Sequence, residues 1–226
     1  MASTWALVPL KSSERAKSRL AEVLDAEQRR QLFFALAEQV IVALHESRNI
    51  DAVAVVTSSL EVAEFATSLH AMPILQEADA GMSPALESAL RSFQAMQLER
   101  VLMVPGDLPL ISARAVDAIF EAQTASEQVV LVPDRRHEGT NALLCSPPQA
   151  IAPRFGSCSF TRHLSAARAA NIATRVVEIE ELALDLDCAD DLDYLRSHAF
   201  ERSASLLAPL RLATASNVPL RAALVG

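Results

Sequence analysis

The sequence predicts an α/β protein, a Rossmann-like three-layer αβα sandwich with a mostly parallel sheet. Short apolar runs typical of buried strands alternate along the chain with segments that have helical spacing. Strands and helices in alternation imply right-handed crossover connections, which place helices on both faces of the sheet. The 226 residues suit one catalytic domain, and because 51% of them are hydrophobic but only 4% aromatic, its core should be aliphatic.

The first half of the chain has the most regular patterns. An apolar run over residues 5–8 is closed by Pro9, which predicts a buried strand leading into a polar, basic loop. Asp25 and Gln28 have the spacing of a capping box, and apolar residues at every fourth position then predict a long helix. The next elements are expected to be a strand at 52–57, a helix at 60–69 and a strand at 72–75.

The second half continues the alternation. Ser83 followed by Pro84 is typical of a helix start, and Ser112 is placed to cap another helix. Further strands are expected at 101–104, 129–132, 142–145 and 175–179, with a helix at 159–170 before the last of them. Because no clean period is found beyond about residue 200, we divide the chain into one domain, 1–200, and a tail, 201–226, of unknown order.

The composition excludes several classes of function. A formal net charge of −8 argues against binding to nucleic acid or to an anionic membrane surface, since both require a positive field. No secretion signal and no apolar run long enough to span a membrane is found. The cysteines, Cys145, Cys158 and Cys188, form no C-x-x-C pair and indicate reduced thiols. We therefore expect a cytoplasmic protein.

Three aspartates are the strongest candidates for a metal site. Asp107 follows the strand expected at 101–104, and Asp185 and Asp187 form a D-x-D pattern that would lie on one face of a strand. Hard oxygen ligands suit Mg²⁺, which would remove the repulsion between the carboxylates. The alternatives are a turn at Asp107 and an exposed acidic strand edge. A short helix should follow, with its cap and solvated face formed by Asp190, Asp191 and Asp193.

A basic cluster lies on the loop after the first strand. It consists of Lys11, Arg15, Lys17 and Arg19, opposed only by Glu14. Lysine ammonium groups and planar arginine forks fit the oxygens of a triphosphate. Since the whole chain is acidic, this cluster points to an anionic small molecule, and a solvated charged turn is the alternative.

Four loop glycines mark further candidate walls of a site: Gly81, Gly106, Gly139 and Gly156. Glycine lets a ligand approach the main chain, and open α/β sheets bind ligands beyond the carboxyl ends of their strands, although a simple turn is the alternative at each glycine. The segments 135–141 and 155–160 can present hydroxyls and backbone N–H groups. The second precedes a helix and fits an acidic acceptor, with capping by Ser157 or Ser159 as the competing interpretation.

Taken in order, the motifs resemble the guanylyltransferase family that activates a phosphorylated three-carbon acid with GTP in coenzyme F-420 biosynthesis. The resemblance covers about residues 5–197. The motifs that carry it are Val8-Pro9-Leu10-Lys11, Ala16-Lys17-Ser18-Arg19-Leu20, Gly106-Asp107-Leu108-Pro109-Leu110, Gly139-Thr140-Asn141-Ala142-Leu143-Leu144, Phe155-Gly156-Ser157 with Ser159-Phe160, and Leu184-Asp185-Leu186-Asp187. The chain departs from the family pattern at Gly81-Met82-Ser83, often Gly-Leu-Asn, and at Cys188-Ala189-Asp190, usually Thr-Pro-Glu.

The resemblance implies a nucleotidyltransferase (GT-A-like) fold. It implies a metal site for Mg²⁺ formed by Asp107, Asp185 and Asp187. The resemblance also implies that Thr140, Gly156 and Ser159 hold the acid substrate, and we expect Asn141 to contact it as well. From the basic loop and the glycine loops we expect the nucleotide to contact Lys11, Lys17, Arg19, Gly81 and Ser83. The catalytic residues would be Lys17, Arg19 and Asp107.

The expected reaction is attack by a phosphate oxygen of the acceptor on the α-phosphorus of GTP, with release of pyrophosphate. Such a nucleophile is ionised at neutral pH and requires no general base, so catalysis reduces to positioning and charge neutralisation. The expected acceptor is 2-phospholactate, phosphoenolpyruvate or 3-phosphoglycerate. The sequence does not decide between a monomer and a homodimer. The alternatives are a molybdopterin-type nucleotidyltransferase or GT-A glycosyltransferase, and a non-catalytic nucleotide-binding protein.

Overall fold

A seven-stranded sheet forms the centre of the molecule in the computed structural model, which describes residues 3–13, 17–76 and 81–208. The strand order is β3-β2-β1-β4-β6-β5-β7. The strands are β1 (Thr4–Pro9), β2 (Ala52–Thr57), β3 (Met72–Leu75), β4 (Arg100–Met103), β5 (Gln128–Pro133), β6 (Thr140–Ser146) and β7 (Ala173–Val176). Every strand expected before residue 180 is present, although β7 begins and ends earlier than the predicted 175–179. The α/β sandwich predicted from the sequence is confirmed.

Strand β6 is the one antiparallel member of the described sheet. It runs opposite to both of its neighbours, β4 and β5, whereas the other neighbouring strands are parallel to each other. The reason is the short connection 134–139 between β5 and β6, which makes a hairpin because it is too short for a crossover helix. The sheet is therefore mostly parallel, as predicted, with a hairpin inserted beside β4.

The helices begin near the predicted positions, but not all of the expected caps are used. They are α1 (Ala26–His45), α2 (Leu60–Ser68), α3 (Met82–Ser92), α4 (Ala113–Glu121), α5 (Ser159–Ala169), α6 (Ala189–His198) and α7 (Phe200–Leu207), with short 3-10 turns such as Glu180–Leu182. Ser112 caps α4 as expected. The prediction for Ser83 is wrong, because α3 begins after Gly81 and the Ser83 hydroxyl donates instead to the Phe155 carbonyl oxygen at 3.4 Å.

The capping box of α1 gives a direct test of helix stability. The Asp25 side chain accepts from the Gln28 N–H at 2.8 Å, and the Gln28 side chain accepts from the Asp25 N–H at 2.9 Å. Asp25→Ala should therefore lower the free energy of unfolding by about 1 kcal/mol. Urea denaturation monitored by circular dichroism measures this loss, and catalytic activity below the transition should be unchanged. Equal stability of the two proteins would contradict this role of the cap.

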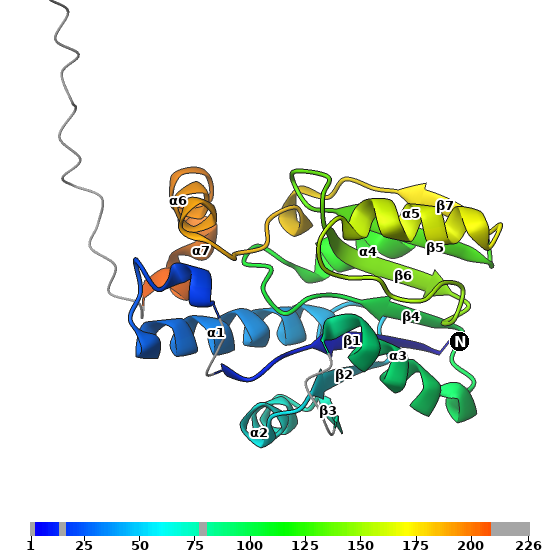
Figure 1. The fold of residues 1–226 in the computed structure, drawn as a ribbon, viewed down its shortest axis with the longest axis horizontal. Coiled ribbons are helices and arrows are strands. Elements are labelled where there is room, and N and C mark those ends of the chain that lie inside the picture. The colour runs from blue at the N-terminus through cyan, green and yellow to red at the C-terminus, as the bar shows by residue number, and fades with distance from the viewer. Residues whose placement is uncertain (1–2, 14–16, 77–80, 209–226) are drawn as a thin grey trace, which may run out of the picture.

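Helices cover both faces of the sheet (Figure 1). One face packs against α1, α2 and α4 in a cluster that includes Val8, Ile41 and Ile119. The opposite face packs against α3 and α5, where Leu7 and Met103 from the strands meet Leu86 from α3. Because both faces are buried, the central strands consist of continuous apolar runs rather than alternating ones.

A third apolar cluster closes the end of the molecule where α1 begins. It joins the first half of α1 to α6 and α7, which lie together at that end in Figure 1. Its buried residues are Leu20, Leu24, Leu32, Leu36, Leu110, Leu184, Leu186, Leu192, Leu195, Leu206 and Leu207. The packed domain therefore extends past residue 200 to at least Leu207, and the rest of the predicted tail, 209–226, lies outside the described residues.

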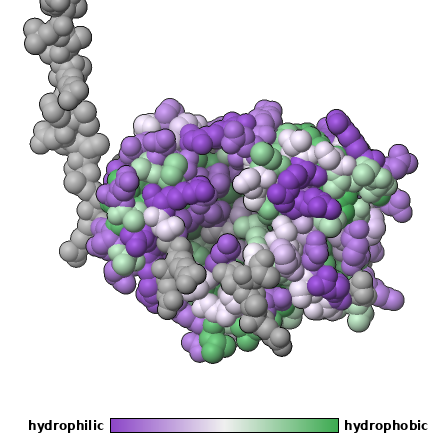
Figure 2. Space-filling model, in the orientation of Figure 1, coloured by the Kyte–Doolittle hydropathy of each residue, from purple (hydrophilic) through white to green (hydrophobic). Residues whose placement is uncertain are grey.

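The surface seen in Figure 2 is mostly hydrophilic, and its hydrophobic residues form small, separate patches. Large exposed apolar side chains occur on several elements, among them Leu60 on α2 and Leu75 on β3. In the part of the chain that the structure describes, no helix is long and apolar enough to cross a membrane.

Candidate active site

The candidate residues gather beyond the carboxyl ends of β1 and β4. The chain leaves β1 toward β2 on one side of the sheet and returns to β4 on the other, so β1 and β4 flank a topological switch point. Loops that leave neighbouring strands in opposite directions open a crevice there, which is where open α/β sheets bind their ligands. The loop after β1 carries Lys11 and Lys17, and the loop after β4 carries Asp107.

Gly106 allows these two loops to approach each other closely. A Cβ atom at this position would lie 2.2 Å from Cδ2 of Leu10, which is buried. Contacts that short do not occur between carbon atoms, so any larger residue would require the Leu10 side chain to move. Gly106 therefore lets the side chain of Leu10 pack directly against the loop that carries Asp107.

Lys17 is the central residue of the site. Its Nζ donates to Oδ2 of Asp107 at 2.8 Å and to Oδ1 of Asp187 at 3.1 Å. Burial by itself would lower the pKa of this amine, but the charges and hydrogen bonds of the two carboxylates more than offset burial, and the pKa is raised. The backbone of Lys17 has a φ of 54°, in the left-handed region that non-glycine residues rarely adopt. The ammonium group is thus held between the two carboxylates at a cost in backbone strain.

The acidic groups around Lys17 have the chemistry of a site for a hard cation. Oδ1 of Asp107 is buried and has no hydrogen-bond partner among the described residues. The pKa of Asp185 is raised to about 6, first by burial and then by the negative charges of Asp107 and Asp187. A divalent cation would satisfy the buried oxygen and relieve the repulsion, so the residues fit such an ion. With Lys17 between the carboxylates, the described part of the chain contains no group of three or more His, Cys, Asp or Glu side chains already arranged to hold a metal ion.

The segment that carries Asp185 and Asp187 is not a strand of the sheet, and that prediction is wrong. It follows the 3-10 turn Glu180–Leu182 as an irregular segment, although Leu184 and Leu186 still alternate in burial with the two aspartates. The physical reason is that its backbone bonds to loops instead of pairing with a strand: the Arg135 N–H donates to the Ala183 carbonyl oxygen at 2.8 Å. The N–H of Leu186 donates to the Asp107 carbonyl oxygen at 3.1 Å, which brings the acidic residues together.

Asn141 anchors the same segment from the hairpin side. Its amide nitrogen donates to the Leu182 carbonyl oxygen at 2.8 Å, and the side chain is buried. The Asn141 side chain is thus bonded to the main chain just before Asp185, and its contact with the acid substrate stays a prediction.

A cleft of about 480 Å³ opens in front of Lys17, within the size range of ligand sites. Its lining includes Lys11, Phe33, Met82, Asp107 and Asp187. A smaller pocket shares several of these walls and extends toward the ends of β2 and β3. Its additional lining residues are Val56, Thr57, Ser58, Gln76, Gly81 and Ala85. Together the two pockets give an elongated site with a charged floor.

Only some of the remaining residues predicted to bind nucleotide line the two pockets. Gly81 lines the smaller pocket, and Lys11 lines both pockets. Ser83 is turned toward Phe155, and the exposed Arg19 is not among the residues that line either pocket. Arg15 lies outside the described residues.

The residues predicted to hold the acid substrate lie where two loops contact each other. Thr140 and Ser159 are buried, and the Phe160 N–H donates to the Glu138 carbonyl oxygen at 3.2 Å. Gly156 has a φ of 105°, so the bend before α5 requires glycine. Neither Ser157 nor Ser159 caps α5, which begins after Cys158 without a side-chain cap. The two loops are thus brought together, although they do not line the cleft.

A fully buried histidine, which the sequence gave no reason to single out, joins these loops. The Arg154 N–H donates to Nε2 of His163 at 2.8 Å, so the ring proton is on Nδ1 and is donated to the Thr140 hydroxyl at 2.9 Å. Burial, followed by the charges of Arg162 and Arg154, lowers the pKa of His163 to about 4. Only a neutral ring can make both bonds, so His163 is held in the tautomer that carries its proton on Nδ1.

This burial makes stability depend on pH. The unfolded chain takes up a proton at His163 near pH 6.5, whereas the folded chain does so only near 4. Between these values the unfolded state binds more protons, so the contribution of His163 to stability is complete above pH 6.5 and is lost as the pH falls toward 4. Urea unfolding at pH 7.5 and 4.5 should show up to about 3 kcal/mol of loss in the wild type beyond that in His163→Gln. Parallel losses in both proteins would contradict a neutral His163.

Comparisons with known proteins show the family of this chain. Residues 4–215 match the family model described as guanylyl transferase CofC like. The chain belongs to the CofC-like guanylyl transferase family. A phosphoenolpyruvate guanylyltransferase of Conexibacter woesei is 38% identical over 86% of this chain and 87% of its own, and one of Sphaerobacter thermophilus is 37% identical over 87% and 94%. A 2-phospho-L-lactate guanylyltransferase of Methanothermobacter thermautotrophicus is 33% identical over 86% and 85%.

Solved structures extend the likeness of the CofC-like fold to more distant proteins. A protein of Desulfovibrio desulfuricans G20, provisionally named a nucleotide-diphospho-sugar transferase, superposes with a TM-score of 0.72 at 17% identity, over 92% of this chain and 95% of its own. A nucleotidyl transferase of Methanothermobacter thermautotrophicus superposes with a TM-score of 0.63 at 18% identity, over 87% and 97%. At these identities the likeness establishes the nucleotidyltransferase-like fold alone.

Proposed function

We propose that this CofC-like chain transfers GMP from GTP to the phosphate of a small phosphorylated three-carbon acid, with release of pyrophosphate, in coenzyme F-420 biosynthesis. The observation that carries the proposal is the ammonium group of Lys17 held between Asp107 and Asp187 at the floor of a cleft beyond the carboxyl ends of β1 and β4. Such a site combines negative charge for a cation with positive charge for phosphates, which phosphoryl and nucleotidyl transfer both require.

The residues of the site have separate tasks in the proposed reaction. Mg²⁺ held by Asp107, Asp185 and Asp187 would neutralise charge on the phosphate oxygens of GTP. Lys17, at hydrogen-bond distance from two of these carboxylates, is placed to stabilise the charge that develops on the departing pyrophosphate. Lys11 in the cleft holds the outer phosphates, and the backbone at Gly81 faces the nucleotide in the smaller pocket.

We propose phosphoenolpyruvate as the first acceptor to test. The two relatives at 38% and 37% identity carry that name, whereas the relative named for 2-phospho-L-lactate is 33% identical. The acceptor phosphate is already ionised at neutral pH, so it attacks the α-phosphorus without a general base. The acceptor carboxylate would bind where the loops at Thr140 and Gly156 meet.

Pyrophosphate release tests the proposal directly. The purified protein is incubated with GTP, Mg²⁺ and either phosphoenolpyruvate, 2-phospholactate or 3-phosphoglycerate, with ATP or CTP replacing GTP in parallel reactions. We expect release with GTP and at least one of the acids, most rapidly with phosphoenolpyruvate, and none without acid. Binding of GTP with no pyrophosphate release from any acid would overturn the proposal. Preference for CTP or ATP would remove the guanine assignment while retaining nucleotidyl transfer.

A further inference from the structure

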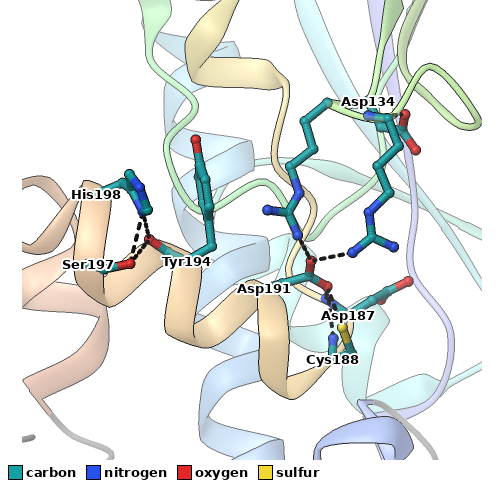
Figure 3. Close-up of polar contacts among 9 residues, drawn as sticks. Asp134, Asp187, Cys188, Asp191, Tyr194, Ser197 and His198 are labelled. Atoms are coloured by element: carbon teal, nitrogen blue, oxygen red, sulfur yellow. Dashed lines mark hydrogen bonds and ion pairs between the residues drawn. The ribbon is translucent and has the colours of Figure 1, made fainter. Parts of the chain in front are cut away.

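Asp191, on the first turn of α6, is the centre of a polar network next to the acidic segment (Figure 3). Its Oδ1 pairs with Nη2 of Arg135 at 2.6 Å. Its Oδ2 accepts three hydrogen bonds: from the Asp187 N–H at 3.1 Å, the Cys188 N–H at 3.0 Å and the Cys188 thiol at 3.1 Å. The guanidinium of Arg135 also lies 4.6 Å from the centre of the Tyr194 ring. The sequence predicts that Asp191 belongs to the cap and solvated face of this helix. The cap is confirmed, because Asp191 accepts from the Cys188 N–H, but a solvated position is wrong, because the residue is buried.

The burial of Asp191 shows that the network is built as a unit. This residue is 6% exposed, and burying a carboxylate without partners costs several kcal/mol. Here both oxygens are engaged, one by Arg135 and, at 4.0 Å, by Arg136, and the other by two backbone N–H groups and a thiol. Neighbouring Asp193, by contrast, has a side chain that is 76% exposed.

Helix capping explains only part of this arrangement. A residue at the third helical position satisfies the N–H of the cap residue, which is the bond from Cys188 to Asp191. The bond from the Asp187 N–H lies one residue before the cap, and the ion pair comes from a loop 56 residues away in sequence. The first of these contacts acts on Asp187, the residue that approaches Lys17, and the second holds Asp191, which accepts that bond.

Arg135 holds the acidic segment at both of its ends. Its own N–H donates to the Ala183 carbonyl oxygen at 2.8 Å, while its guanidinium holds Asp191. Asp185 and Asp187 lie between these two points of attachment. One residue of the β5–β6 hairpin therefore constrains the whole stretch that carries the two carboxylates.

We propose that Asp191, held by Arg135, is a positioning residue that fixes the main chain at Asp187 and so directs the Asp187 carboxylate toward Lys17 and Asp107. The inference deepens the proposed function and depends on it where a metal is concerned. Neither Asp191 nor Arg135 is required to touch the reactants. Partners that orient a metal ligand in this way commonly change metal affinity by 10- to 100-fold when they are removed.

Metal affinity and ligand orientation are measured separately to test the inference. Mn²⁺ binding is followed by electron paramagnetic resonance, without substrates, in the wild type and in Asp191→Asn, Arg135→Gln and Arg135→Lys. We expect the dissociation constant for Mn²⁺ to rise by about 10- to 100-fold in Asp191→Asn and Arg135→Gln, with partial recovery in Arg135→Lys, which restores the charge. Asp193→Asn, on the same helix but exposed, should bind within twofold of the wild type. Lower thermal stability with unchanged Mn²⁺ affinity in these variants would reduce Asp191 to a helix cap.

Crystal structures of the wild type and Arg135→Gln provide the readout that does not depend on the metal. The Asp187 carboxylate should move away from Nζ of Lys17 in the variant, and an unmoved Asp187 would overturn the positioning role.

If the wild type binds no Mn²⁺ and Asp107→Asn retains GMP transfer, the metal in the proposed function is wrong, and the displacement of Asp187 alone decides the inference. If the wild type binds Mn²⁺ but transfers no GMP, the proposed reaction fails, while the affinities still decide the role of Asp191.

Discussion

Asp107→Asn is expected to lower the rate of GMP transfer by about 10³-fold or more while leaving the fold intact. The substitution keeps the size of the side chain but removes a charge from the centre of the site, where Oδ2 meets Lys17 at 2.8 Å and the buried Oδ1 has no hydrogen-bond partner in the described structure. Loss of a carboxylate that holds a catalytic cation removes several kcal/mol of transition-state stabilisation, and each 1.4 kcal/mol corresponds to about tenfold in rate.

The measurement is pyrophosphate release at saturating GTP and phosphoenolpyruvate over a range of Mg²⁺ concentrations. Asp117→Asn is a matched control, because that aspartate lies on α4, lines neither pocket of the site and accepts hydrogen bonds from Ser47 and Asn49 on the connection between α1 and β2. Its activity should remain close to that of the wild type. An Asp107→Asn protein with wild-type turnover at every Mg²⁺ concentration would show that this residue holds no catalytic metal.

Much of the fold could be predicted because its signals are local. The capping box at Asp25 and Gln28 and the apolar runs of β2 and β5 depend on residues within one turn or one strand, and each was found in place. The antiparallel direction of β6 was not predicted, because it follows from the length of the hairpin connection and the pairing of β6 with β4. The alternation of leucine and aspartate over residues 184–187 predicts a strand, although pairing with a neighbour, which the sequence does not show, is what defines a strand.

The sequence could predict the position of a site residue only where the topology of the sheet alone determines it. Asp107 follows a buried parallel strand, so its place at the carboxyl edge of the sheet follows from the fold class. The partners of Asp191 and His163 depend on contacts between loops far apart in the sequence, such as Arg135 with Asp191. No spacing rule connects them, so the sequence places Asp191 only on the cap and solvated face of a helix and does not single out His163. Burial with full hydrogen bonding, visible only in the structure, distinguishes them from surface residues.

The position of Lys17 suggests how the site changes when it is loaded. Its ammonium group now compensates the charges of Asp107 and Asp187, with a side chain only 6% exposed. A divalent cation bound to the same carboxylates would replace that compensation and release the ammonium group toward the phosphates. Because Nζ of Lys17 and the cation would compete for the same oxygens, the lysine should weaken metal binding in the absence of nucleotide and support catalysis in its presence.

Lys17→Met separates these two effects. Methionine keeps the length and the apolar stem of the side chain and has the same backbone cost at a φ of 54°, so the change isolates the charge. Without metal, the carboxylates lose their counter-charge, and because Asp107 and Asp187 are partly exposed we expect a loss of about 2 kcal/mol of stability, below the range for fully buried pairs.

Addition of Mg²⁺ should restore most of the lost stability in Lys17→Met and raise its melting temperature more than that of the wild type, since binding to the native state alone is stabilising. GMP transfer should nevertheless fall by about 10²- to 10³-fold, because no ammonium group is left to stabilise the departing pyrophosphate.

Calorimetric melting with and without Mg²⁺ measures the effect on stability, and pyrophosphate release measures the effect on catalysis. Lys11→Met, at the exposed side of the cleft, is the control and should melt like the wild type in both conditions. If Mg²⁺ stabilised wild type and Lys17→Met equally, the ammonium group and the metal would not share the carboxylates, and Lys17 would belong to the phosphate site alone.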